Sequence, residues 1–382
     1  MKNKPRIRFK GFTEDWEQRK LSDILKVNSG KDYKHLDQGN IPVYGTGGYM
    51  LSVNESLSNI DAIGIGRKGT IDKPQYLKAP FWTVDTLFYL TALDHHSILF
   101  LYYFIQLIPW KKYDESTGVP SLSKTTIDNI SGYVPLNSKE EELISTLFNQ
   151  LDKSITLQQR KLEKLKLAKK ALLQKLFPKN GSQFPEIRFK GFTDAWEQRK
   201  LGEIGKWYKG IGGTKDDLNT KHSGRMFVHY ADLYQTSEFL TTVIHWTTNE
   251  NIGSLITPNS ILFPMSDVTP YGLARTTSCK INEVRAGGDV LINTIDKSID
   301  SDFVSIYINL FSKNILPFVT GTTVKHINSK ALSELTILIP SFEEQLKIVN
   351  VVNFYNKVIT LHQRKLDKLQ EVKKGLLQKM FV

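Results

Sequence analysis

The chain has 382 residues, of which 40% are hydrophobic and 24% charged, and its formal net charge is +12. This usage is ordinary for a globular protein, and the length predicts two or three domains with sizeable cores. The single cysteine, Cys279, excludes a disulfide framework and a cysteine-based zinc site. The longest apolar stretch, 97–110, is too short to span a bilayer and favours a buried helix. The first residues lack the apolar run of a signal peptide, so we expect a cytoplasmic protein.

A segment near the start of the chain recurs in its second half. Residues 5–21 read PRIRFKGFTEDWEQRKL and residues 185–201 read PEIRFKGFTDAWEQRKL, with 14 of 17 positions identical. We call these two stretches the IRFKGF segments. The stretches that follow them, 22–135 and 202–340, show almost no similarity to each other. The sequence therefore predicts two copies of one plan, in which a constant frame holds two divergent bodies.

The first divergent body has mixed α/β character and several glycine-bearing loops. The glycine clusters are IPVYGTGGYM at 41–50, DAIGIGRKGT at 61–70 and ESTGVPSLSK at 115–124. Glycine allows close backbone approach, and neighbouring Tyr, Thr, Arg and Lys side chains can bind phosphates and base edges, so these loops suit a DNA groove. For any one loop, an ordinary turn with glycine at positive φ remains the alternative. Residues 64–69 lack the spacing of a phosphate-binding loop, because no Lys-Ser/Thr pair follows the last glycine.

Each half ends in a long amphipathic helix. The sequence LQQRKLEKLKLAKKALLQKLF at 157–177 returns as LHQRKLDKLQEVKKGLLQKMF at 361–381, with 14 of 21 positions identical. Apolar positions alternate in steps of three and four, which predicts a coiled-coil seam. The seam consists of Leu151, Ile155, Gln158, Leu162, Leu165, Ala168, Leu172 and Leu176 in one helix and Tyr355, Ile359, His362, Leu366, Leu369, Val372, Leu376 and Met380 in the other. Upstream residues that extend the apolar stripe are Leu143, Ile144, Leu147, Leu346, Val349 and Val352.

The signals for the start of each helix are repeated as well. Pro135 and Pro340 each precede a serine, and acidic residues follow at positions where the helix dipole favours them. Each helix is ~38 residues and ~57 Å long. The link from 178 to 184 is short, so we expect the two helices to pair antiparallel within one chain. A spacer of this kind suits two DNA-binding domains that contact adjacent stretches of the same DNA.

Positive charge is concentrated on the same helices. Residues 151–180 contain nine Lys or Arg and two acidic residues, and residues 355–382 contain seven and two, which gives +7 and +5. A basic chain favours a polyanionic partner. Phosphate contact, an acidic protein partner and a solvated helix face all remain open as explanations of this excess.

The second divergent body carries its own glycine-bearing loops, at 209–217, 227–234, 264–276 and 319–330. By the same reasoning, these loops are candidates for groove contact. The candidate DNA-binding residues of the two bodies are Tyr44, Thr46, Gly47, Gly48, Tyr49, Arg67, Lys68, Thr117, Lys209, Gly212, Gly213, Thr214, Tyr230, Thr269, Tyr271, Arg275, Thr322 and Lys325.

Signals for catalysis are weak. The motifs of serine hydrolases, zinc proteases and amino-methyltransferases are absent. Asp85, Asp300 and Asp302 are scattered acids without a lysine at nuclease-like spacing. The pair His95–His96 precedes an apolar helix and is expected to lie at its start rather than to bind a metal. We therefore predict no catalytic residue and no metal site in this chain.

Together, these features resemble the specificity subunit of type I restriction–modification enzymes. The residues that carry the resemblance are IRFKGFT-x-x-WEQRKL at 7–21 and 187–201, the Thr-Gly loops at Thr117 and Thr320, VPLNSKEEE at 134–142, IPSFEEQ at 339–345, and the QRKL and LLQK motifs of the helices. The resemblance covers essentially the whole chain, and the order of these parts is its diagnostic feature.

The resemblance implies a mixed α/β protein with two target-recognition domains and an internal pseudo-two-fold repeat. Two long helices would join the domains and form an antiparallel coiled coil. The implied boundaries are 1–137 for the first recognition domain, 138–178 for the first spacer helix, 179–340 for the linker and second recognition domain, and 341–382 for the second spacer helix.

The resemblance also implies that the chain reads a bipartite, asymmetric sequence in double-stranded DNA, one half per domain. The implied partners are two methyltransferase (modification) subunits that use S-adenosylmethionine to methylate adenine, and restriction/translocase subunits that use ATP and Mg. Catalysis and cofactors would then belong to the partners and not to this chain. Two other classes stay open from the residues alone: a stand-alone DNA-binding regulator with a helical arm, and a protein-recruiting scaffold.

Overall fold

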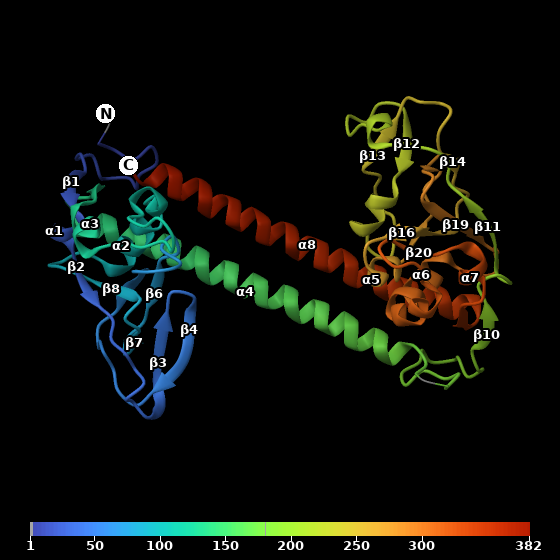
Figure 1. Cartoon of the computed structure of the whole chain (residues 1–382), viewed down its shortest axis with the longest axis horizontal. Helices are drawn as coiled ribbons and strands as arrows, with labels where there is room; N and C mark the ends of the chain where they lie inside the picture. Colours follow the sequence, from blue (N-terminus) through green and yellow to red (C-terminus); the bar gives the residue numbers. More distant parts are fainter. Residues whose placement is uncertain (1–2, 180) are drawn as a thin grey trace. The chain divides into compact units, whose positions relative to one another are not determined.

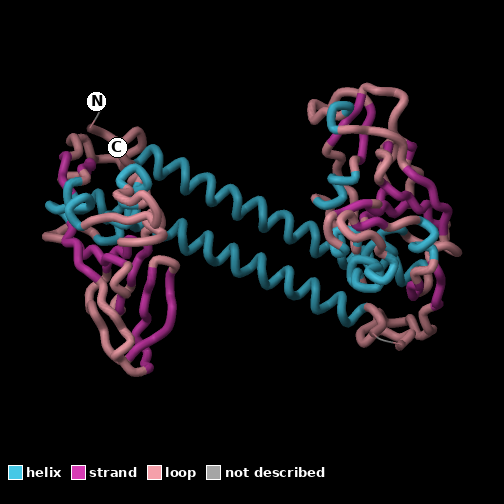
Figure 2. The backbone as a smooth tube through the Cα atoms, viewed as in Figure 1, coloured by secondary structure: helices cyan, strands magenta, loops and turns pink. Residues whose placement is uncertain are grey.

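The computed structural model describes residues 3–179 and 181–382, which separate into two compact units. Unit 1 contains the chain up to Lys161 together with His362–Val382, and unit 2 contains Leu162–Leu361. Each unit therefore holds one IRFKGF segment, one divergent body and a stretch of each long helix. Figure 1 labels most of the helices and strands, and Figure 2 shows the same backbone by secondary structure.

The body of unit 1 contains nine strands and three short α-helices among its described residues. They are β1 (Glu17–Lys20), α1 (Leu21–Ile24), β2 (Leu25–Ser29), β3 (Gln38–Gly45), β4 (Gly48–Val53), β5 (Ala62–Gly66), β6 (Gln75–Leu77), β7 (Trp82–Thr83), β8 (Leu87–Ala92), α2 (Ile98–Ile105), α3 (Lys124–Asn129) and β9 (Ser131–Val134). A 3-10 helix, η1 (Trp110–Tyr113), follows α2.

The body of unit 2 has a longer series of elements. They are β10 (Glu197–Lys200), β11 (Gly205–Lys209), η2 (Lys215–Asp217), β12 (Arg225–Val228), η3 (Tyr230–Tyr234), β13 (His245–Thr247), β14 (Ser254–Leu255), β15 (Ser260–Pro264), β16 (Ser266–Asp267), α5 (Pro270–Leu273), β17 (Thr277–Cys279), β18 (Arg285–Ala286), β19 (Val290–Ile295), α6 (Ser301–Leu310), η4 (Ser312–Phe318), β20 (Lys325–His326), α7 (Ser329–Ser333) and β21 (Thr336–Ile339).

The two bodies share a sheet that their sequences do not reveal. A four-stranded antiparallel sheet has the order β2-β8-β5-β6 in unit 1 and β11-β19-β15-β17 in unit 2. In both units a buried helix, α2 or α6, follows the second strand of this order. Each IRFKGF segment ends in a strand that pairs antiparallel with the last strand of its body, β1 with β9 and β10 with β21. The predicted mixed α/β repeat is therefore confirmed.

A second, smaller sheet differs between the two bodies, but it is inserted at the same point in the order of the main-sheet strands. In unit 1 it has the order β4-β3-β7, and in unit 2 the order β13-β12-β18-β14. A long excursion between the first strand and the middle of the main sheet supplies β3 and β4 in one body and β12 and β13 in the other. In both cases a late strand joins in parallel, β7 beside β3 and β18 beside β12.

The two long helices are α4 (Ser138–Leu176) and α8 (Phe342–Met380). In unit 1, Asp152 binds Lys373 at 2.6 Å and Gln158 contacts His362, so the residue numbers fall along α8 as they rise along α4. In unit 2, Lys169 binds Asn356 at 2.8 Å, which continues the same antiparallel order. The helices therefore pair antiparallel within the chain, as predicted.

Most of the predicted seam positions are buried or half-buried. Ala168 and Val372 are exceptions, since both side chains are exposed. The upstream extension of the seam is wrong: Leu143 and Leu346 are exposed, whereas the other upstream residues pack into the cores of the bodies. The reason is that the first turns of both helices lie against their own body instead of against the other helix.

A cluster of three aromatic rings holds the end of a helix in the core of each unit. In unit 1, Phe381 stacks on Phe100 at 5.4 Å and meets Trp16 edge-on at 6.0 Å. The backbone N–H of Ile7 also donates to the carbonyl oxygen of Lys379 at 2.9 Å. The end of α8 is thus a component of the first body's core, although α8 begins in unit 2.

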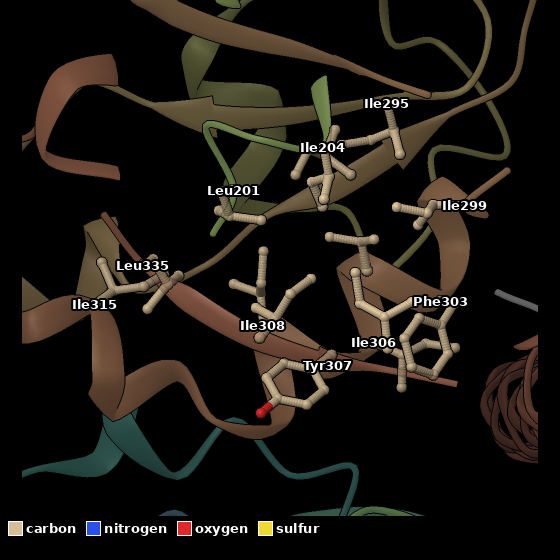
Figure 3. Close-up of a cluster of buried hydrophobic side chains, with 14 of the residues drawn as sticks. Leu201, Ile204, Ile295, Ile299, Phe303, Ile306, Tyr307, Ile308, Ile315 and Leu335 are labelled. Atoms are coloured by element: carbon tan, nitrogen blue, oxygen red, sulfur yellow. The ribbon is translucent and has the colours of Figure 1, made fainter. Parts of the chain in front are cut away.

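The equivalent cluster in unit 2 uses the end of α4. Phe177 stacks on Phe303 at 5.6 Å and meets Trp196 edge-on at 5.6 Å. The backbone N–H of Ile187 donates to Lys175 at 2.9 Å. Figure 3 shows part of this core, whose buried side chains include Phe303 and Leu201, the last residue of the second IRFKGF segment.

A buried ion pair joins each IRFKGF segment to the start of its own body's long helix. Arg8 donates to both carboxylate oxygens of Glu140, at 2.6 and 2.8 Å. Arg188 donates to both oxygens of Glu344, at 2.9 and 2.8 Å. These hydrogen bonds raise the pKa of each arginine although partial burial opposes the shift. The acidic residues at the helix starts therefore do more than match the helix dipole, because two of them anchor the repeated segments.

The first prediction concerns the three-ring cluster. Phe381→Ala should destabilise the protein by ~3–5 kcal/mol, because it removes a buried ring that contacts Trp16, Phe100 and Phe148. Phe354 lies on the same helix with 64% of its surface exposed, so Phe354→Ala should change stability by less than ~0.5 kcal/mol. Thermal and urea unfolding followed by circular dichroism will compare the two variants. Equal stability of the two variants would contradict the role assigned to the helix end.

Candidate nucleic-acid interface

Three loops that are distant in sequence come together in unit 1. They are the β3–β4 turn with its flanking residues (44–50), the loop after β5 (67–70), and the loop between η1 and α3 (114–121). The backbone N–H of Gly69 donates to the carbonyl oxygen of Pro120 at 2.8 Å, and Lys68 forms an isolated β-bridge with Ser121. A Cβ atom at Gly69 would lie 3.6 Å from Oγ1 of Thr46. We call these three loops the first loop cluster.

The first loop cluster contains eight of the residues predicted to bind DNA, and several of them are exposed. Arg67, Lys68, Thr117 and Tyr49 are exposed, with 62% of the surface of Tyr49 accessible. The guanidinium of Arg67 lies 5.8 Å from the centre of the Phe88 ring. Two cations and an exposed aromatic ring are therefore presented by adjacent loops, which is a combination suited to nucleic acid.

Internal hydrogen bonds order the third loop of this cluster. The carboxylate of Asp114 accepts from the backbone N–H groups of Ser121 and Ser116, at 2.9 and 3.0 Å. These bonds hold the pKa of Asp114 below its usual value. The loop that carries Thr117 is therefore shaped by the chain itself.

The equivalent connections come together in unit 2. They are 230–234 after β12, 266–276 between β15 and β17, and 320–326 before α7. Strands β16 and β20 pair antiparallel and join the second stretch to the third. The hydroxyl of Tyr234 donates to the carbonyl oxygen of Ser266 at 3.1 Å and joins the first stretch to the second. We call these three stretches the second loop cluster.

Six predicted residues of the second body lie in this cluster, and their environments differ. Tyr271 is exposed, with 69% of its surface accessible, and Thr269 and Thr322 are exposed as well. Arg275 is engaged within the protein: it donates to the carbonyl oxygens of Tyr234 and Thr236, at 3.2 and 3.4 Å. Lys325 is also engaged, since its ammonium donates to Gly321 and Thr322 carbonyl oxygens at 2.8 and 2.7 Å.

Four predicted residues, 209–214, lie outside this cluster. The stretch packs on 286–290, where Gly288 donates to the carbonyl oxygen of Gly212 at 2.7 Å. Gly213 has a φ of 88°, and a Cβ atom there would collide with the ring of Phe227. Thr214 caps η2. The structure thus gives these four residues roles in packing or in turns. Contact with DNA remains a prediction for Lys209, Gly212, Gly213 and Thr214.

The reading of Asp300 and Asp302 as scattered acids is wrong. Both carboxylates bind the ammonium of Lys280, at 2.7 and 2.9 Å. Burial lowers the pKa of Lys280, but the hydrogen bonds to the two carboxylates outweigh it and raise the pKa. Asp300 also accepts from the backbone N–H groups of Asp302 and Phe303 as the N-cap of α6. These acids are therefore occupied with capping a buried helix.

Neither a metal cluster nor a membrane span is found in the part of the chain that the structure describes. Residues 3–179 and 181–382 contain no group of three or more His, Cys, Asp or Glu side chains placed to hold a metal ion. None of the described helices is both long enough and apolar enough to cross a membrane. His96, at the start of α2, binds the buried carboxylate of Glu141 at 2.8 Å.

Some residues of the clusters had no signal in the sequence. Gln75 Nε2 donates to the carbonyl oxygens of Gly45 and Thr46, at 3.0 and 3.2 Å, and so holds the β3–β4 turn from a neighbouring strand. Met50 lies next to Tyr49 with 48% of its surface exposed. A glutamine at the start of a three-residue strand belongs to no motif, so only the structure could identify it.

Comparison with known proteins is consistent with this arrangement. The family model described as "Type I restriction modification DNA specificity domain" matches residues 13–167 and again residues 193–371. Two relatives from Methanocaldococcus jannaschii are 23% identical: the MjaVIII type I restriction enzyme specificity subunit, and a protein assigned as the MjaX specificity subunit. The alignments cover 95% of this chain in both cases, and 91% and 92% of the relatives.

Solved structures share the fold. The S subunit of the type I restriction–modification system from M. genitalium has a TM-score of 0.71 at 14% identity, over 99% of each chain. A chain from a structure of type I restriction–modification complex assembly has a TM-score of 0.54 at 14% identity, covering 96% of this chain and 97% of that one. The chain therefore belongs to the family of type I restriction–modification DNA specificity subunits.

The second prediction distinguishes the roles of Arg67 and Arg275, which the sequence analysis named equally as candidate DNA-binding residues. Arg67→Ala should weaken binding of the cognate DNA by ~1–3 kcal/mol if the arginine contacts a base, and should leave the melting temperature unchanged. Arg275→Ala should lower the melting temperature, because it leaves two backbone carbonyls without their donor.

The control is Lys164→Ala, at an exposed position of α4. DNA titrations and thermal melts will be compared for the three variants. An equal loss on cognate and random DNA would assign Arg67 to a phosphate, and no loss on either would remove it from the interface.

Proposed function

We propose that this chain reads a bipartite, asymmetric sequence in double-stranded DNA, with one half read by each body. The observation that supports this most is that the family model matches twice, once over each body with its following helix. In addition, each unit presents three equivalent connections as one loop cluster. We assign residues 1–137 and 179–340 to the two recognition domains, and 138–178 and 341–382 to the spacer helices.

The proposal places the chemistry on partner subunits. Two modification subunits would methylate adenine with S-adenosylmethionine, and restriction subunits would use ATP and Mg to move and cut DNA. This chain would supply sequence recognition and no catalytic residue.

The third prediction tests whether the bodies read independently. Exchange of residues 22–135 for the body of another such subunit should change one half of the methylated sequence and leave the other half intact. The exchange keeps Trp16, Glu140 and Phe381, which are the contacts of the frame. The readout is a map of methylated adenines in DNA treated with the assembled complex. A change in both halves, or in neither, would contradict one reader per body.

The fourth prediction concerns the spacer helices, whose length we propose to set the gap between the half-sites. Four residues inserted after Lys166 lengthen one helix by ~6 Å, close to two base-pair steps, and rotate the seam by only about 40° beyond a full turn. The gap should then grow by about one or two base pairs while the half-site sequences stay the same. An unchanged gap at full methylation activity would overturn the role of the helices as a spacer.

A further inference from the structure

We infer that the tip of the β3–β4 hairpin reads the C5-methyl groups of thymine in the major groove, through Tyr49 and Met50, and that Gln75 holds the tip in position. This inference rests on the proposed function. It adds the chemical group that is read, the two side chains that read it and the residue that positions them.

The tip presents apolar surface that its own unit leaves uncovered. Strand β3 pairs with β4 up to Gly45 opposite Gly48, so the turn itself is only Thr46 and Gly47. Tyr49 and Met50 follow immediately, with 62% and 48% of their surfaces exposed. Consecutive strand residues point to opposite faces. The hairpin therefore carries an apolar side chain on each face of its tip.

Both side chains contact other residues of their own hairpin. The Tyr49 ring meets the Tyr44 ring edge-on at 6.5 Å, and its hydroxyl lies 3.1 Å from Oγ of Ser52. A Cβ atom at Gly45 would lie 2.7 Å from the sulfur of Met50, so the Met50 side chain packs over Gly45. Side chains held in one arrangement lose little entropy on binding, which suits them to discriminate small differences in shape.

The backbone of the tip is fixed from outside the hairpin. Gln75, at the start of β6, donates from one amide nitrogen to the carbonyl oxygens of Gly45 and Thr46. Its side chain is half-buried. A Cβ atom at Gly48 would meet no other atom within 4 Å, so the outer side of the turn is open. The tip is thus rigid on its inner side and accessible on its outer side.

The surroundings of the tip favour DNA as the occupant of this apolar surface. The exposed cations Arg67 and Lys68 are in the same loop as Gly69, where a Cβ atom would lie 3.6 Å from Oγ1 of Thr46, and cations of this kind bind the phosphates that flank a groove. The major groove admits a two-stranded β-ribbon, and the thymine methyl is the one apolar group that the bases present there. An apolar tip beside two exposed cations matches a methyl group beside a phosphate.

The test removes single methyl groups from the DNA. Methylation mapping defines the target, and the body exchange defines the half read by unit 1. Duplexes with deoxyuridine in place of one thymine are then titrated against the chain assembled with its modification subunits. At one or more positions of this half-site, the loss of the methyl should weaken binding about four-fold, which corresponds to ~0.8 kcal/mol for one buried carbon.

The variants assign the effect to the tip. Tyr49→Ala and Met50→Ala should bind thymine and uracil duplexes equally at the position that each side chain reads. Gln75→Leu keeps the volume of the side chain but removes its donor, so this variant should also lose the discrimination. Gln75→Glu removes the amide donor as well and should have the same effect. Phe354→Ala, at an exposed position of α8 outside both loop clusters, should leave the discrimination intact.

The outcomes are distinguishable from failure of the proposed function. A half-site without thymine, or uracil duplexes that bind as well as thymine duplexes at every position, would overturn the inference while sequence-specific binding persists. Discrimination that survives in both alanine variants would also overturn it. Absence of any preference for a defined DNA sequence would instead remove the proposed function itself. If Tyr49→Ala and Met50→Ala lose a modification subunit and keep DNA discrimination, the patch binds protein and the inference is wrong.

Discussion

The fold depends on the insertion of each long helix into the body at which it ends. Phe381 closes the ring cluster of Trp16 and Phe100, and Phe177 closes that of Trp196 and Phe303. Neither body can complete its core from its own stretch of sequence, because the missing ring arrives at the end of a helix. This requirement explains why the repeated parts of the sequence are the IRFKGF segments and the helix ends, which are the two surfaces that must fit each other in both units.

A division of labour follows from this constraint. In the frame, one arginine of each repeated segment is bound inside the protein: Arg8 and Arg188 each bind a buried carboxylate, and loss of one partner of such a pair typically costs ~3–5 kcal/mol. In the loop clusters, by contrast, side chains such as Tyr49 and Tyr271 are exposed and contribute little to either core. Substitution in the clusters can therefore change what is read without changing the scaffold, which is the property that a sequence-reading subunit needs.

The sequence predicted the elements whose signal is periodic or repeated. Apolar residues in steps of three and four indicated both long helices, and the short link at 178–184 indicated their antiparallel order. The shared four-stranded sheet was not predicted, because buried strand positions accept many apolar residues and its strands have diverged. Contacts across long separations were also missed: Lys280 with Asp300, and Gln75 with the β3–β4 turn. The candidate DNA-binding loops were found by their glycines. Gly213, however, is a glycine because it packs on Phe227, and no local sequence pattern distinguishes such a glycine from one in a turn that faces a DNA groove.

Under the proposed function, the repeated segments form the frame and the two loop clusters form the surface that reads DNA. Hydrogen–deuterium exchange of the assembled complex, with and without its cognate duplex, tests this claim most directly. We expect new protection in 44–50, 67–70 and 114–121 and in the second loop cluster, and unchanged exchange in the two IRFKGF segments. Protection confined to the IRFKGF segments, with both loop clusters unchanged by DNA, would contradict it.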